Sequence, residues 1–262
     1  MADRPEILLL PERPPLDDRP VARRVGLVVL STDHTSEADY RQLVAGPGIG
    51  VYVARMPFAN PVTPRNLLAM QPRLTEAAAL ILPGEPLDAL CYSCTSASVV
   101  IGDDAIAAAI AAGKPGVPVV TPPAAATAGL RALGARRISI LTPYTLETSR
   151  PMSDYFLAGG FEIASFSCLG LEDDREMARI RPAALVDLAV ATIADDAEAL
   201  FISCTAVRAA GLAAEIEART GRPMVSSNLA TAWQCRRLCG DGSARPELGR
   251  LMAMPLLERG PQ

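Results

Sequence analysis

Two stretches of this 262-residue chain end in the same three residues: residues 87–95 read LDALCYSCT, and residues 197–205 read AEALFISCT. In each stretch a short apolar run, typical of a buried β-strand, leads into Ser-Cys-Thr. The two cysteines, Cys94 and Cys204, lie 110 residues apart (204 − 94). This spacing indicates that the second half of the chain repeats the first.

Three further pairs of segments occur in the same order, at offsets between 105 and 113 residues. They are residues 23–25 and 136–138, 50–54 and 160–164, and 118–121 and 223–226. The offsets differ only by amounts that loops can absorb, and four ordered matches are hard to attribute to chance. In both halves apolar strand patterns alternate with helical patterns, which predicts parallel βαβ units.

The expected fold is therefore α/β, with two pseudo-symmetric halves that each contain a four-stranded parallel sheet flanked by helices. We expect an N-terminal extension over residues 1–22, a first half over residues 23–121 and a second over residues 122–225, with residues 226–262 able to pack on the first half. Ligands of open α/β sheets bind beyond the carboxyl ends of the strands. Both Ser-Cys-Thr sites fall there, so the sequence predicts an active site in the cleft between the halves.

The composition excludes several kinds of site and partner. The chain is 50% hydrophobic and 21% charged with a net charge of −4, which argues against disorder and against a nucleic-acid or anionic-membrane surface. The single histidine, His34, excludes a paired-histidine zinc site. Residues 1–20 lack the pattern of a targeting signal, and no strongly apolar stretch has the length of a membrane span. We expect a cytoplasmic protein whose six cysteines are reduced.

Helices are expected soon after each cysteine, over residues 98–112 and 207–220. The positive end of a helix attracts a carboxylate and lowers the pKa of a thiol. Hydroxyl groups of Thr95, Ser96 and Thr205 add donors for charge that develops on a substrate carboxylate. One cysteine removing an α-proton while the other delivers a proton to the opposite face is two-base racemisation, which needs no metal or organic cofactor.

The chain resembles the aspartate/glutamate racemase superfamily. The duplicated Cys-Thr sites, Ser31–Thr35 and Thr142–Tyr144 carry the resemblance, which runs from about Arg23 to Gly240. The maleate isomerase and arylmalonate decarboxylase branch is nearest. Within it the chain is most similar to the ectoine-utilisation protein A (EutA) family, through LILPGEPLDALCYSCTSASVVIGD, LTPYTLETSRPMSDYF and GLEDDREMARI.

This resemblance implies roles for individual residues. Cys94 and Cys204 fall on the two catalytic positions of the family, and Tyr144 falls on a tyrosine that contacts substrate in maleate isomerases. Thr95 and Thr205 follow the cysteines where carboxylate-binding donors lie. Decarboxylase members keep only the later cysteine, so the presence of both favours racemisation or isomerisation.

Two positions depart from the maleate isomerase pattern, in which asparagines grip the carboxylates of the substrate. Asp33 and Asp174 stand at or beside those positions here. An aspartate repels a dicarboxylate and attracts a cation. Ectoines carry a cyclic amidinium and one carboxylate, so we hypothesise that Asp33 or Asp174 pairs with the amidinium while a Cys-Thr site holds the carboxylate.

Each of these residues also has a plainer interpretation. Cysteines are often buried packing residues, and Cys91, Cys94, Cys235 and Cys239 are alternatively a four-thiolate zinc site. Asp33 is alternatively a helix cap, and Asp174 part of a solvated loop that starts a helix. Asn228 follows the last predicted strand, where its side chain can reach the cleft, and His34 is a neighbour of the site or an ordinary loop residue.

The sequence thus predicts a cofactor-independent racemase or epimerase of a small chiral carboxylate, hydroxyectoine or a related compound. Its catalytic residues are Cys94 and Cys204, and its substrate-binding residues are Asp33, Thr95, Ser96, Tyr144, Asp174, Thr205 and Asn228, with no metal ligand. The alternatives are a maleate-type cis–trans isomerase, a cysteine-dependent decarboxylase, or a non-catalytic sensor of an ectoine-type ligand. The only partner that the residues indicate is a small carboxylate; the resemblance is also compatible with a homo-oligomer.

Overall fold

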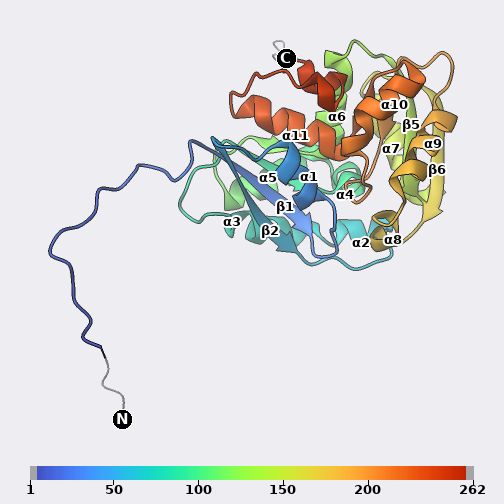
Figure 1. Ribbon diagram of the computed structural model, residues 1–262. Coiled ribbons are helices and arrows are strands. Elements are labelled where there is room, and N and C mark those ends of the chain that lie inside the picture. The colour runs from blue at the N-terminus through green and yellow to red at the C-terminus, as the bar shows by residue number, and fades with distance from the viewer. Residues whose placement is uncertain (1–4, 258–262) are drawn as a thin grey trace.

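Two parallel sheets of four strands each form the centre of the molecule (Figure 1). The structure, a computed structural model of the chain, describes residues 5–257. In the first sheet the strand order is β2 (Ile49–Met56), β1 (Arg23–Leu30), β3 (Ala89–Ser93) and β4 (Val119–Val120). In the second it is β6 (Glu162–Leu171), β5 (Arg137–Tyr144), β7 (Ala199–Ile202) and β8 (Met224–Ser226). The identical order confirms the predicted pseudo-symmetric α/β fold.

Buried central strands and amphipathic covering helices form the core. Seven of the eight residues of β1, and seven of the eight of β5, are buried, as expected for parallel strands covered on both faces. The α-helices are α1 (Ser36–Leu43), α2 (Pro64–Leu68), α3 (Leu74–Ala79), α4 (Thr95–Ile101), α5 (Asp103–Gly113), α6 (Pro122–Ala132), α7 (Leu146–Ala158), α8 (Asp174–Met177), α9 (Pro182–Thr192), α10 (Ala213–Thr220) and α11 (Ser227–Leu238). Short 3₁₀ turns lie at η1 (Gln71–Arg73), η2 (Ala210–Leu212), η3 (Pro246–Leu248) and η4 (Arg250–Ala253).

The structure corrects two of the expected helices. The helix expected over residues 98–112 is two helices, α4 and α5, that meet at Gly102 with an angle of 100°. Gly102 has φ +93°, a conformation that glycine adopts without a steric penalty. The helix expected from Val207 begins only at Ala213, because residues 203–209 form an irregular loop against the first half.

The C-terminal part of the chain returns to the first half. Helix α11 packs against α1, α6 and β3, and the indole N–H of its buried Trp233 donates to the Met254 carbonyl at 2.8 Å. The first described residues instead extend away from the body (Figure 1), and the side chains of Ile7–Leu10 are exposed. The two sheets themselves span residues 23–120 and 137–226.

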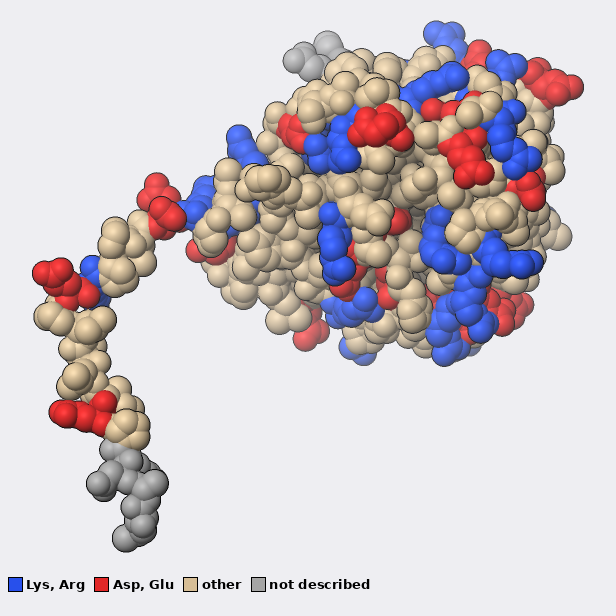
Figure 2. Space-filling view, viewed as in Figure 1, with Lys and Arg blue, Asp and Glu red and all other residues tan. Residues whose placement is uncertain are grey.

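The surface carries both signs of charge. On the face shown in Figure 2, basic and acidic side chains lie beside one another over most of the body. Within residues 5–257 no single helix has the length and apolar character needed to cross a membrane. Helices α4 and α5 reach that length only when taken together across their bend of 100°.

Candidate active site

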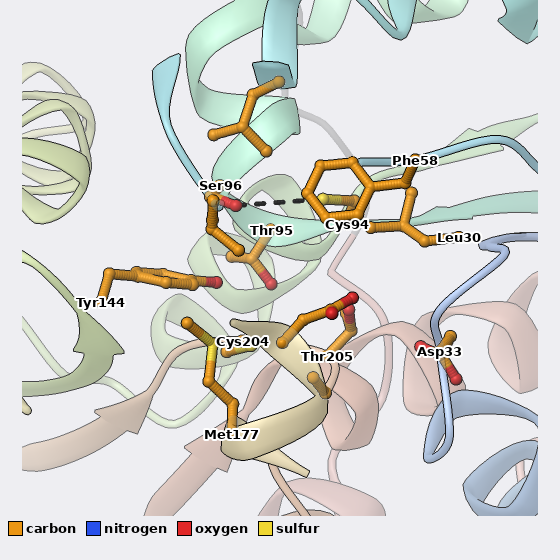
Figure 3. Close-up of a pocket in the computed structure, with 14 residues that line it drawn as sticks. Leu30, Asp33, Phe58, Cys94, Thr95, Ser96, Tyr144, Met177, Cys204 and Thr205 are labelled. Carbon is orange, nitrogen blue, oxygen red and sulfur yellow. Dashed lines mark hydrogen bonds between the residues drawn. The ribbon is translucent and has the colours of Figure 1, made fainter. Parts of the chain in front are cut away.

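A pocket with about 330 Å³ of empty space, part of it open to solvent, lies where the carboxyl ends of the two sheets face each other (Figure 3). Leu30 ends β1, Tyr144 ends β5, Cys94 follows β3 directly, and Cys204 follows β7 after one residue. The pocket brings together eight of the residues predicted from the sequence: Asp33, Cys94, Thr95, Ser96, Tyr144, Asp174, Cys204 and Thr205.

Cys94 sits at the start of α4 in a relaxed backbone conformation. It is the residue before the helix, with φ −152° and ψ 107°, and only 4% of it is exposed. The Ala97 amide hydrogen-bonds to its sulfur, and Ser96 Oγ lies 3.9 Å from Sγ. These contacts lower the pKa of the thiol, but burial outweighs them and raises it to about 11.

Cys204 occupies a different local structure. Its φ of +93° lies in the left-handed region, which is strained for a residue with a Cβ. The backbone amides of Ala206 and Val207 and the Tyr144 hydroxyl hydrogen-bond to its sulfur and lower its pKa. Burial has the larger effect and raises the pKa of this thiol to about 12.

Both cysteines are therefore neutral thiols at pH 7 in the free protein. The expectation that helix ends depress their pKa values is wrong for two reasons. No helix starts at Cys204, and at Cys94 the desolvation of a buried thiolate exceeds the stabilisation from the helix end. A reactive thiolate must form only as a bound substrate takes part in the proton transfer.

Tyr144 points into the pocket from the side of the second sheet (Figure 3). The residue is 2% exposed. Burial raises the pKa of its phenol well above the usual value, and the nearby sulfurs of Cys204 and Cys94 add to this effect. Tyr144 therefore remains a neutral hydroxyl donor beside both thiols.

Asp33 lines the pocket, but its carboxylate is directed to its own loop. Oδ1 accepts from the backbone amides of Thr35 and Ser36 at 2.9 and 2.8 Å, and Oδ2 accepts from Ser36 Oγ at 2.7 Å. Burial raises the pKa of this carboxyl above its usual value. Asp33 thus binds the backbone at the start of α1 and also contributes negative charge to the pocket.

Asp174 is likewise held by protein groups. Asn60 Nδ2 donates to Asp174 Oδ1 at 2.8 Å, and Thr32 Oγ1 donates to Oδ2. Sequence reasoning missed Asn60, Thr32 and the pocket residue Phe58. A usable signal existed for the loop after β2, because β2 ends at the same sheet edge as β3 and its loop must reach the same cleft.

The pocket wall is apolar on one side and acidic on another. Its apolar lining residues include Leu30, Phe58, Val62, Leu67 and Met177. Among the residues that line it, Asp33 and Asp174 are the only ones with an ionisable carboxyl, and none is a lysine or arginine. The lining therefore offers an anion no cationic side chain, only hydroxyl, thiol and backbone amide groups.

Both threonine hydroxyls are hydrogen-bonded to other segments of the protein, and that of Thr205 links the two halves. Thr95 Oγ1 donates to Ser227 Oγ at 2.8 Å, and Thr205 Oγ1 donates to the Ser93 carbonyl at 3.2 Å. Each hydroxyl proton is thus already engaged by the protein, while Ser96 stays next to the Cys94 sulfur. The proposed donor role of Thr95 and Thr205 requires these hydroxyls to change partner when substrate binds.

Two other predicted neighbours lie outside the pocket lining. Asn228 is 1% exposed, and its Nδ2 donates to the Thr205 carbonyl and to Asp39. His34 is exposed in a surface groove with Arg175, Arg179 and Arg208. Asn228 therefore contacts the backbone of the cysteine loop rather than the cavity.

The remaining cysteines do not form the alternative zinc site within the described residues. Cys94 lines the pocket, whereas Cys91 and Cys235 lie around the buried hydroxyl of Tyr40, 3.8 Å from Cys235 Sγ. In residues 5–257 no group of three or more His, Cys, Asp and Glu side chains is arranged to hold a metal ion. Cys91 and Cys235 are packing residues of the first half.

The fold and the paired thiols define a class of pseudo-symmetric α/β proteins with a two-cysteine pocket between the halves. The profile of the arylmalonate decarboxylase family matches residues 73–252, and the chain belongs to this family, within the Asp/Glu racemase-like superfamily. The arylmalonate decarboxylase of Bordetella bronchiseptica is 35% identical over 139 residues, which is 52% of this chain and 58% of that protein.

Maleate isomerases match more of the chain. The maleate isomerase of Nocardia farcinica is 29% identical over 241 residues, covering 88% of this chain and 95% of that protein. A solved structure of the Nocardia farcinica maleate cis–trans isomerase, a cysteine-to-serine mutant with a covalently bound succinylcysteine intermediate, superimposes with a TM-score of 0.80. It is 27% identical and covers 88% of this chain and 98% of that chain.

Proposed function

We propose that the protein is a cysteine-dependent isomerase of a small unsaturated carboxylate, a cis–trans isomerase of the maleate type. The single observation that carries the proposal is the meeting of Cys94, Cys204 and Tyr144, all buried, in one pocket between the halves. The similarity to maleate isomerases over 88% of the chain supports the same reaction class. Two cysteines in place favour isomerisation over decarboxylation.

Cys94 is the better nucleophile of the pair. It lies at the start of α4 in an unstrained conformation, where the free amides of the first helical turn can stabilise a thiolate as it forms. The succinylcysteine found in a cysteine-to-serine maleate isomerase supports a reaction in which one cysteine carries the adduct while the other is dispensable for its formation. Cys204, with the Tyr144 hydroxyl at its sulfur, is then the proton donor and acceptor.

The proposed reaction adds a thiol across the double bond and removes it again. Cys94 Sγ bonds to one alkene carbon, the π electron pair moves to the neighbouring carbon, and Cys204 delivers its proton there while it receives the proton of Cys94. The bond between the two carbons is now single and rotates. Reversal of the proton transfer and cleavage of the S–C bond then release the trans isomer with both thiols restored.

The acidic wall favours a second candidate reaction. Asp33 and Asp174 line the pocket and no lysine or arginine does, so a zwitterion with a cationic group suits its charge better than a dianion does. Hydroxyectoine and related cyclic amidines have this charge pattern. On such a substrate one cysteine would take the α-proton as a thiolate while the opposite thiol delivers a proton to the other face, which inverts the centre without a cofactor.

Substrate exchange followed by nuclear magnetic resonance tests the two reactions. The purified protein is incubated in heavy water with maleate and, separately, with hydroxyectoine. Conversion of maleate to fumarate supports the isomerase, and α-deuteration of hydroxyectoine with a change in its optical rotation supports the racemase or epimerase. Tight binding of hydroxyectoine without exchange supports a sensor, and neither binding nor turnover of either compound contradicts both substrate assignments.

Asp33→Asn and Asp174→Asn separate the same alternatives by charge. Each variant keeps the size of the side chain and removes a negative charge from the pocket. Affinity for a zwitterion should fall in these variants, whereas affinity for a dicarboxylate should rise. If both variants keep the wild-type affinity for hydroxyectoine, the charge argument for the second reaction is wrong.

A further inference from the structure

The loop that carries Cys204 is fixed to the opposite half of the molecule by side chains, two of which, Thr35 and Asn228, lie outside the pocket lining. Thr35 Oγ1 donates to the Ala206 carbonyl at 2.7 Å, and Thr205 Oγ1 donates to the Ser93 carbonyl at 3.2 Å. Asn228, on the helix that packs on the first half, donates to the Thr205 carbonyl at 2.9 Å. Three consecutive hydrogen bonds therefore hold residues 205–206 from across the cleft.

Asn228 uses its amide in an unusual way. Both acceptors near Nδ2, Thr205 O and Asp39 Oδ2 at 2.7 Å, require a donor, so the NH₂ group must face them. The amide oxygen is then buried without a hydrogen-bond partner among the described residues. A buried acceptor without a partner costs free energy. The Asn228 amide thus keeps the two hydrogen bonds that its NH₂ group donates, although its oxygen accepts none.

The backbone next to these contacts needs such support. Cys204 holds φ +93°, and a residue with a Cβ persists there only when its surroundings fix it. The residues directly after Cys204 do not belong to an α-helix, because α10 begins only at Ala213. External hydrogen bonds to residues 205–206 thus replace the support that α4 gives to Cys94.

We propose that Asn228, oriented by Asp39, is a positioning residue that clamps the Cys204 loop to the first half and so sets the placement of the Cys204 thiol against Cys94. Asn228 does not touch the cavity, and its effect on catalysis passes through the Thr205 carbonyl. Asp39 supplies the second acceptor that keeps the amide turned toward Thr205. The catalytic consequence rests on the proposed function; the clamp itself does not.

Selective thiol modification tests the clamp without any substrate. The folded protein is treated with iodoacetamide, and the alkylation of Cys94 and of Cys204 is followed by peptide mass spectrometry. In Asn228→Leu, which keeps the branching of the side chain and removes both donors, we expect Cys204 to react at least about fivefold faster and Cys94 to change by less than about twofold, because only one loop is released.

Matched variants identify the cause. Tyr155→Phe removes another bond between the halves, from Tyr155 Oη to Asp103 at 2.7 Å, away from both cysteine loops, and should leave both rates unchanged. Asp39→Asn keeps an acceptor for Asn228 and should stay near the wild type. Thr35→Val removes the neighbouring bond to Ala206 and should accelerate Cys204 selectively, which decides the question if Asn228→Leu does not fold.

Turnover provides the second measurement. Misplacing a reacting group by about 1 Å lowers kcat by up to about 100-fold, so Asn228→Leu should lower kcat at least about tenfold with KM nearly unchanged. The proposal is overturned if Cys204 is alkylated no faster in folded Asn228→Leu and Thr35→Val than in Tyr155→Phe, or if both cysteines accelerate equally. A selective acceleration in a protein that turns over neither maleate nor hydroxyectoine retains the clamp and rejects the proposed function.

Discussion

The two Ser-Cys-Thr sites have the same sequence and the same place at the end of a third strand, yet their local structures differ. Cys94 precedes a regular helix in an extended conformation. Cys204 is strained, is followed by an irregular loop and is held by hydrogen bonds from the other half. Duplication of the sequence has therefore preserved the position of the thiol but not its support.

Under the proposed function, this difference gives the two thiols different catalytic roles. The sulfur of Cys94 faces Ser96 and a backbone amide at the start of α4. The sulfur of Cys204 accepts a hydrogen bond from Tyr144, which is suited to proton transfer. A nucleophile on one side and a proton donor on the other require an asymmetric pocket, which identical halves would not provide.

Replacement of either thiol by a hydroxyl should have the largest effect. Cys94→Ser and Cys204→Ser should each lower kcat for maleate by at least about 1,000-fold, because serine is a much weaker nucleophile and acid than cysteine. Steady-state kinetics measures both variants, and the double variant should lose little more than either single one, since the pair acts as a unit. Near-wild-type turnover in either variant would contradict the assigned roles.

The pH dependence of cysteine alkylation is the next largest effect that we expect. Burial raises both thiol pKa values, so the thiolate fraction at pH 7 is roughly 10⁻⁴ at Cys94 and lower at Cys204. Thiolate is the reactive form and its fraction grows with pH below the pKa. Alkylation of each cysteine should therefore rise about 100-fold between pH 7 and pH 9. A plateau near pH 7 at either cysteine would show a thiol that is already ionised.

Tyr144→Phe should have a smaller effect that is confined to one cysteine. The phenol hydrogen-bonds to Cys204 and lowers its pKa, so its removal should raise that pKa further and slow Cys204 alkylation. We expect kcat to fall about tenfold, the usual scale for loss of one group that assists proton transfer. Alkylation of Cys94 is the internal control, and Tyr155→Phe is the matched tyrosine variant. Equal slowing of alkylation at both cysteines would contradict a role of Tyr144 that is confined to Cys204.

The sequence was sufficient to predict the sheets and the two cysteines. Alternation of strands and helices, together with the internal repeat, predicts two parallel sheets and places both Ser-Cys-Thr sites at facing sheet edges, whereas the strand order comes from the structure. Eight of the nine predicted site residues line the pocket for that reason. These predictions depend on local patterns that recur in the chain.

The features of the site that the sequence did not predict depend on contacts between distant segments. The pairing of Asn60 with Asp174 joins residues 114 positions apart, and that of Asn228 with Asp39 joins residues 189 positions apart. No local pattern encodes such pairs. The sequence predicted lowered thiol pKa values, whereas the structure raises them. The cause is burial, which outweighs the effect of the helix end at Cys94 and arises only when the two halves pack together.

Intact-protein mass spectrometry after incubation with maleate tests most directly the unequal roles of the two thiols. The Cys204→Ser variant should gain the mass of the substrate, with the adduct mapped to Cys94. The nucleophile is intact and the serine hydroxyl or a water can supply the proton that completes the adduct, whereas no thiolate is left to remove that proton again. The Cys94→Ser variant should gain no mass. An adduct on Cys204 in the Cys94→Ser variant, with none on Cys94 in the Cys204→Ser variant, would contradict the account.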